Sequence, residues 1–146
     1  MKTRGQASLS VWIARHSLLV WIGIVVNFAF IIPLVFHPAW ILGLLGIPLN
    51  QLIWARCSGW LLFIITCYYI PATIDIVRYR ANAWLAILPS RTGGSVFFIV
   101  AVFVFGHPPG FLSIALVDGF IAVTTLYCLI KIETLERARA AGGAST

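Results

Sequence analysis

Residues 18–36 read LLVWIGIVVNFAFIIPLVF, an apolar run that contains no charge and one amide side chain, that of Asn27. A helix needs about 20 apolar residues to cross a hydrocarbon core about 30 Å thick. The run therefore predicts a transmembrane helix over residues 17–36. It is too long for a signal-peptide core, and no small-residue cleavage site follows it, which favours a helix that is retained.

Three further apolar stretches predict transmembrane helices over residues 52–76, 92–106 and 111–132. We expect a kink at Pro71, and we expect the last helix to continue beyond residue 132. The stretch NAWLAILP at residues 82–89 is amphipathic and is expected at the membrane interface. The tail at 140–146 is expected to be flexible. The predicted fold is all-α: one transmembrane domain over 1–146, folded as an up-down bundle of four helices with short turns at the outer side.

The composition supports a membrane protein. Of 146 residues, 61% are hydrophobic and 10% are charged. Soluble domains are about 45–50% apolar and about 25% charged, and so short a soluble chain could not bury this much apolar surface. The lipid bilayer is therefore the expected partner. The net charge of +6 comes from basic residues at helix ends, a placement that indicates membrane orientation and no nucleic-acid partner.

Basic residues predict the orientation. Nine of them fall in three groups of three, before the first helix, between the second and third, and after the fourth: Lys2, Arg4, Arg15; Arg78, Arg80, Arg91; Lys131, Arg137, Arg139. The other two loops contain no Lys or Arg, and only Arg56 lies near them, just inside the second helix. Because loops rich in Lys and Arg stay in the cytoplasm, both termini are predicted to be cytoplasmic.

Asn27, Arg56 and Asp118 are predicted to lie at similar depth inside the membrane. An unpaired charge at the centre of a membrane helix costs at least about 2.5–3.5 kcal/mol on insertion scales. We therefore expect Arg56 to pair with Asp118, with Asn27 hydrogen-bonded nearby. Two interpretations stay open. The cluster either fixes helix packing or forms a polar site for a lipid headgroup, a quinone carbonyl or a proton.

No motif indicates catalysis. The chain has no C-x-x-C pair, haem attachment sequence, phosphate loop, H-E-x-x-H or G-x-S-x-G. Asp75 and Arg78 are spaced for a local ion pair. His37 and His107 are expected at the outer face, where a haem or metal site is an alternative to interface packing. Cys57 and Cys67 would lie about 15 Å apart along one helix and could not form a disulfide. No catalytic residue, metal site or cofactor is assigned.

Several short motifs, taken in order, resemble the uncharacterised DoxX-like membrane proteins of bacteria. They are a proline-containing end of the first helix, LLGIP at 44–48, Arg56 with Gly59, Asp75 before Arg78–Tyr79–Arg80 and Trp84, R-x-G-G at 91–94, and Asp118–Gly119. The chain departs from the pattern at Pro89–Ser90, where a Leu-Gly pair is expected. The resemblance implies a four-helix bundle in the bacterial plasma membrane and an association with quinone-linked oxidation. It supplies no catalytic residues.

Two functions follow as hypotheses. The first is a non-catalytic accessory or scaffold subunit of a larger membrane complex, plausibly a redox or respiratory one, whose partners are other membrane subunits. The second is a small membrane protein that binds a quinone or a lipid in a polar pocket around Arg56 and Asp118. A cavity that opens to lipid near the polar residues would favour the second. A continuous apolar face matched to a partner would favour the first.

Overall fold

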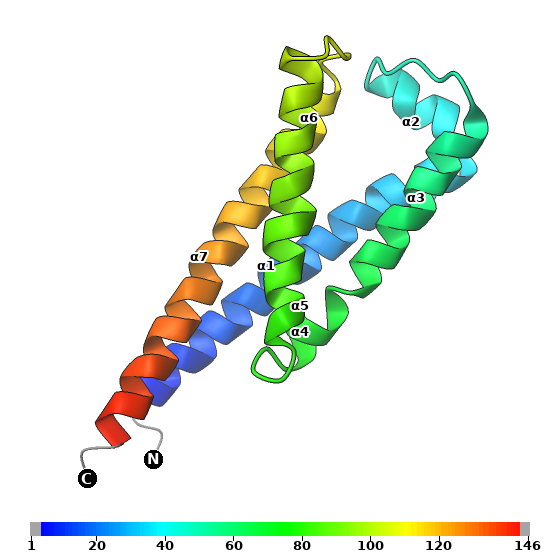
Figure 1. The fold of residues 1–146 in the computed structure, drawn as a ribbon. Helices are drawn as coiled ribbons and strands as arrows, with labels where there is room; N and C mark the ends of the chain where they lie inside the picture. The colour runs from blue at the N-terminus through cyan, green and yellow to red at the C-terminus, as the bar shows by residue number, and fades with distance from the viewer. Residues whose placement is uncertain (1–3, 144–146) are drawn as a thin grey trace.

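Four long apolar helices form the molecule, each long enough to cross a membrane. The computed structural model describes residues 4–143, with side chains described from Ser8 to Ala141. The spans cover Ser8–Phe36, Leu52–Ile74, Arg80–Phe103 and Phe111–Ala141. The start of the first helix and the end of the last helix lie at the same end of the bundle (Figure 1). The prediction of an all-α protein with four membrane spans is confirmed for the described residues.

Helix α1 (Arg4–Phe36) starts well before the predicted residue 17 and continues through Pro33. One face of it is buried at helical spacing: Val20, Ile24, Asn27 and Ile31 are each less than a tenth exposed. The positions between them, such as Leu18, Ile22 and Val25, are about half or more exposed. This pattern is that of a helix that faces its own bundle on one side and lipid on the other.

A short helix that the sequence did not predict, α2 (Pro38–Leu44), follows α1 at the end of the bundle opposite the termini (Figure 1). Pro38 at its first position has the backbone angle that a helix start requires. The carbonyl of Leu45, just after α2, comes very close to the last inter-helix turn. A Cβ built on Gly110 would lie only 1.8 Å from that oxygen. Only glycine permits the two loops to meet in this way.

The second span contains α3 (Leu52–Cys67) and α4 (Ile70–Ile74). The break at Tyr68 and Tyr69 stands directly before Pro71, so the predicted kink is confirmed. Proline lacks the N–H that would continue the helical hydrogen bonds, and its ring crowds the preceding turn.

The third span starts earlier than predicted. It consists of α5 (Arg80–Leu85), the π-helix η1 (Ala86–Thr92) and α6 (Gly93–Phe103). The stretch 82–89, predicted at the interface, forms the first part of this span. Pro89, which favours a helix boundary in the sequence, lies inside the wider π turn. A π turn has more room for the proline ring than an α turn, so the helix continues through it.

Helix α7 (Phe111–Gly143) forms the fourth span and continues past residue 132, as predicted. Residues 140–143, expected in the flexible tail, belong to this helix, and 144–146 lie outside the described residues. Helix α1 packs against both α3 and α7, while α6 packs along α7. Helix α3 has little direct contact with α6 or α7. Figure 1 shows α3 and α6 on separate sides of the far half of the bundle.

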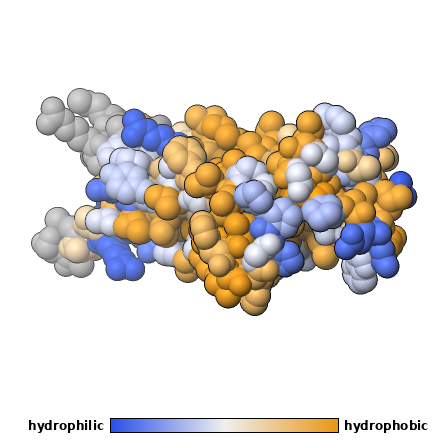
Figure 2. Space-filling model, turned by 90° about the horizontal axis from the view of Figure 1, so that it is seen from above, coloured by the Kyte–Doolittle hydropathy of each residue, from blue (hydrophilic) through white to orange (hydrophobic). Residues whose placement is uncertain are grey.

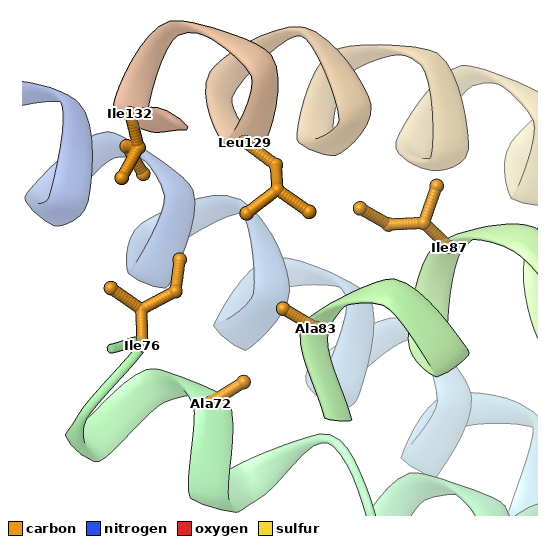
Figure 3. Packing of buried hydrophobic residues seen from close by; sticks show 6 residues of the cluster. All are labelled: Ala72, Ile76, Ala83, Ile87, Leu129 and Ile132. Carbon is orange, nitrogen blue, oxygen red and sulfur yellow. The ribbon is translucent and has the colours of Figure 1, made fainter. Parts of the chain in front are cut away.

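The apolar core lies in the half of the bundle that bears the termini. Figure 3 shows six buried side chains that meet there, from α4 and the turn after it, α5, η1 and α7: Ala72, Ile76, Ala83, Ile87, Leu129 and Ile132. Trp12 and Ile13 of α1 pack against this cluster. Ala72 and Ala83 belong to α4 and α5, which pack against each other. Small side chains let helices approach closely, which is how helices gain packing energy in lipid.

The outer surface is apolar over its middle part. Large exposed side chains follow one face of α7 at Leu116, Phe120, Val123 and Tyr127. Figure 2 shows hydrophobic residues over much of the visible face, with hydrophilic residues at the left and right ends and in a smaller patch right of centre. Such a surface would be costly in water and is suited to the lipid bilayer.

Candidate intramembrane polar site

Arg91, and not Arg56, pairs with Asp118. Arg91 Nη1 donates to Asp118 Oδ1 at 2.7 Å and joins η1 to α7 across the middle of the bundle. The side chain of Arg91 is 5% exposed and that of Asp118 is 24% exposed. Arg56 lies on the exposed side of α3, and its side chain has no hydrogen bond or ion pair among the described residues. The expected pairing of Arg56 with Asp118 is therefore wrong.

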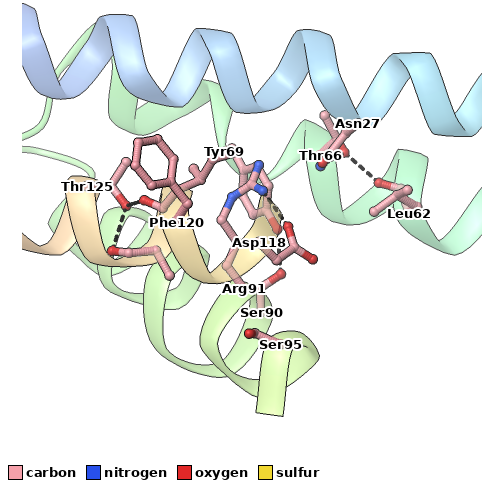
Figure 4. Close-up of polar contacts among 12 residues, drawn as sticks. Asn27, Leu62, Thr66, Tyr69, Ser90, Arg91, Ser95, Asp118, Phe120 and Thr125 are labelled. Atoms are coloured by element: carbon pink, nitrogen blue, oxygen red, sulfur yellow. Dashed lines mark hydrogen bonds and ion pairs between the residues drawn. The ribbon is translucent and has the colours of Figure 1, made fainter. Parts of the chain in front are cut away.

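The guanidinium of Arg91 fits into space that α1 leaves open. A Cβ on Gly23 would lie 2.5 Å from Arg91 Nη2, so the missing side chain makes room for the cation. On another side the guanidinium carbon lies 5.1 Å from the ring centre of Tyr69, a distance at which the ring face attracts a cation. Tyr69 is hydrogen-bonded through its hydroxyl to Ser90. Figure 4 shows Arg91 between Tyr69 and Asp118.

Asn27 forms a second polar contact, between α1 and α3. Its Nδ2 donates to Thr66 Oγ1 at 2.8 Å, and Thr66 in turn donates to the carbonyl of Leu62 at 2.6 Å (Figure 4). Asn27 and Thr66 are 6% and 1% exposed. Asn27 is thus hydrogen-bonded to Thr66, and not beside an Arg56–Asp118 pair as expected.

A cavity of about 300 Å³ lies between the α1–α3 pair and the α6–α7 pair. Asn27, Ser58 and Asp118 are the polar residues of its wall, and the rest is apolar. Leu61 and Val117 belong to the wall and are also 60% and 39% exposed, so the cavity opens to the surface that lipid would cover. Its size is at the lower end of the range for small-molecule sites. Two of the three predicted residues, Asn27 and Asp118, thus meet at one cavity, and Arg56 is not part of it.

The remaining predicted residues occupy separate places. His37 and His107 are both exposed at the end opposite the termini; His107 packs edge-on against Phe111, with ring centres 6.2 Å apart. Within the described residues no group of three potential ligands could hold a metal ion. Asp75 Oδ1 accepts the backbone N–H groups of Val77 and Arg78 at 3.0 Å each, so it stabilises a turn and does not bind the Arg78 guanidinium. The three cysteines are free.

Polar side chains also join α5 to α7 near the termini. Trp84 Nε1 donates to Glu133 Oε1 at 3.0 Å, and Arg80 pairs with Glu136. Glu133 lies 3.5 Å from Arg137 one turn along α7. These contacts hold the start of the third span against the last helix.

Comparison with models of known families, with curated proteins and with solved structures found no match. The geometry itself is therefore the basis for any function. It comprises a buried ion pair, a buried amide–hydroxyl contact and an apolar cavity that both of them border.

Proposed function

We propose that this membrane protein binds a lipophilic small molecule in the cavity between α1, α3, α6 and α7. The observation that supports the proposal is that a mostly apolar cavity, open toward lipid, ends at Asn27 and Asp118. Small-molecule sites commonly combine an apolar wall with a few polar groups that orient the ligand. A carboxylate inside a membrane segment is costly, and such residues commonly serve function.

The ligand would enter from the bilayer, because the exposed wall residues Leu61 and Val117 face it. Its tail would lie among apolar side chains such as Phe98 and Ile114, and its polar head would reach Asp118. A lipid or a quinone meets these requirements. The resemblance to DoxX-like proteins adds weight to a quinone and to the inner membrane of a bacterium as the location.

Mass spectrometry of protein extracted with its surrounding lipid tests the proposal. Val117→Trp should fill the cavity, whereas Val123→Trp on the same helix adds an equal side chain at a lipid-facing position outside it. We expect a lipophilic compound that is enriched with the unaltered chain and with the Val123 variant, and is lost with the Val117 variant. The same set of bound compounds in all three proteins would contradict the proposal.

A second candidate is the accessory or scaffold subunit of a larger membrane complex. The observation in its favour is the aromatic surface at the far end of the third span, where Phe103 and Phe105 are 74% and 67% exposed. Phe98 of the same helix lines the cavity instead. Gentle extraction should then give a particle much larger than the 16.1 kDa chain, and Phe103→Ala should dissociate it where Phe98→Ala does not. A particle of the chain alone would count against this function.

A further inference from the structure

The hydrogen-bonding state of the cavity wall limits which polar head it can accept. Three polar residues line the cavity, and each already has a hydrogen bond elsewhere: Asn27, Ser58 and Asp118. A hydroxyl has one proton to donate and two lone pairs to accept, while a carboxylate only accepts.

Ser58 has only acceptor capacity left. Its Oγ donates to the carbonyl of Trp54 at 2.9 Å, within the same helix. That bond uses the single hydroxyl proton. Toward the cavity the side chain therefore offers lone pairs.

The orientation of the Asn27 amide is determined by its neighbour. Thr66 uses its hydroxyl proton on the carbonyl of Leu62, so Thr66 Oγ1 can only accept from Asn27. The amide must therefore turn its Nδ2 to Thr66. The carbonyl oxygen Oδ1 of Asn27 and one N–H remain for other partners.

Asp118 presents a free carboxylate oxygen. Oδ1 accepts the bond from Arg91, and no described residue donates to Oδ2. The positive charge of Arg91 already balances the carboxylate, and Arg91 is not part of the cavity wall. Its unpaired Nη2 is buried on the side of Gly23 and is separate from the residues that line the cavity. A ligand in the cavity thus meets an ion pair with no net charge, and the atom that this pair offers to it is the acceptor Asp118 Oδ2.

We propose that the head of the ligand is a neutral hydroxyl group, that of a phenol or an alcohol, which donates its proton to Asp118 Oδ2. This inference rests on the proposed function and names the class of ligand. The wall offers acceptors at all three residues and one N–H at Asn27. A ketone, an ether or a quinone in its oxidised form could accept that single N–H and would leave Asp118 Oδ2 without a donor. A fatty acid or a phosphate would place a second negative charge beside Asp118.

Competition in lipid nanodiscs tests the hydroxyl preference. An alkylphenol with a photoreactive diazirine in its tail labels the protein, and four competitors with equal tails are compared at equal mole fraction in the bilayer: para-dodecylphenol, para-dodecylanisole, dodecanol and dodecanoate. We expect the phenol to compete roughly tenfold more strongly than its methyl ether, because a bond to a charged acceptor is lost. Dodecanoate should compete least. The dodecanol arm shows whether an alcohol suffices or a phenol is required.

Two variants separate the possible outcomes. Val117→Trp should abolish labelling of the cavity, and Val123→Trp should not; equal labelling in both would overturn the binding site itself. If labelling depends on Val117 but the anisole competes as well as the phenol, the site stands and the hydroxyl preference is overturned. Asp118→Asn should remove the preference for phenol over anisole. If that variant does not fold, the comparison of phenol with anisole in the unaltered chain still decides the hydroxyl preference, and Val117→Trp still decides the site.

Discussion

Arg91 Nη1 lies 2.7 Å from Asp118 Oδ1, and this ion pair joins the third and fourth spans in the middle of the bundle. Each charge alone would be costly at that depth. Together they form one nearly neutral unit, whose cation is buried among α1, Tyr69 and α7 and whose anion faces the cavity. The same contact therefore fixes helix packing and supplies the polar end of the proposed site.

A double-mutant cycle tests this pair. Arg91→Met or Asp118→Leu alone leaves an unpaired buried charge and should lower the free energy of unfolding by about 3–5 kcal/mol. The double variant should recover much of that loss, because apolar residues can replace a buried pair. Thermal denaturation in detergent measures the stability of each variant. Arg56→Gln is the control and should change stability by less than about 0.5 kcal/mol. A larger loss for Arg56→Gln than for Arg91→Met would restore Arg56 as the partner of Asp118.

The sequence predicts the four spans well, because long apolar runs have few alternatives in a chain this short. It also predicts the kink before Pro71 and the extension of the last helix. The predicted start of the third helix, just after Pro89, is wrong. A proline inside an apolar run normally ends a helix, but here the π turn continues through it.

The wrong start of the third helix also explains why Arg91 was not predicted as the partner of Asp118. A third helix that begins at residue 92 places Arg91 in the inner loop, among the orientation signals. The span instead begins at Arg80, so Arg91 lies near its middle, at the depth of Asp118. The apolar residues before Pro89, at positions 83–88, are the signal that the helix starts earlier. Hydrogen-bond partners such as Thr66 for Asn27 depend on helix rotation, which one sequence does not specify.

Gly23 should be required for the position of Arg91. A Cβ at this position would lie 2.5 Å from Arg91 Nη2 and 3.4 Å from Ile121 Cγ2, so Gly23→Ala should push the guanidinium away from Asp118. We expect a loss of about 1–3 kcal/mol in the free energy of unfolding, the usual cost of an overpacked site. Gly43→Ala is the control, because a Cβ there meets no atom within 4 Å.

The cause of that loss can be checked in the background of Arg91→Met. Without the guanidinium, the methyl group that Gly23→Ala introduces has space, so the substitution should cost little there. Equal costs in both backgrounds would show that the glycine serves the backbone of α1 and not the position of Arg91.

Thr66 should stabilise α1 against α3 through Asn27. Thr66→Val keeps the side-chain shape but leaves the buried Nδ2 of Asn27 without its acceptor, at a cost of about 1–3 kcal/mol. Thr124→Val is the matched control, since Thr124 bonds only to carbonyls of its own helix. Asn27→Leu combined with Thr66→Val should recover stability. A double variant as unstable as the sum of the two single ones would argue against the contact.

The side of the bundle that bears both described ends should face the cytoplasm. Both described ends lie on one side of the molecule (Figure 1). The third span begins with Arg80, two residues after Arg78. The positive-inside rule predicts that this side faces the cytoplasm. In a version with its native cysteines replaced by alanine, Asn50→Cys and Pro109→Cys should react with a membrane-impermeant thiol reagent in intact cells. Ala81→Cys and Ala138→Cys should react only after the cells are opened. All four positions have exposed side chains, so burial does not bias the comparison.

Position 109 is chosen over its neighbour for a structural reason. Gly110 is in backbone contact with Leu45, and a side chain there would disturb the turn being probed. Labelling of Ala81→Cys in intact cells, with Asn50→Cys protected, would reverse the orientation. Such a reversal would leave the cavity and the ion pair unchanged, because both are defined within the bundle and not by the side of the membrane. It would place the Leu45–Gly110 contact on the cytoplasmic side, and the basic residues at the described ends and at the start of α5 would then fail to follow the rule.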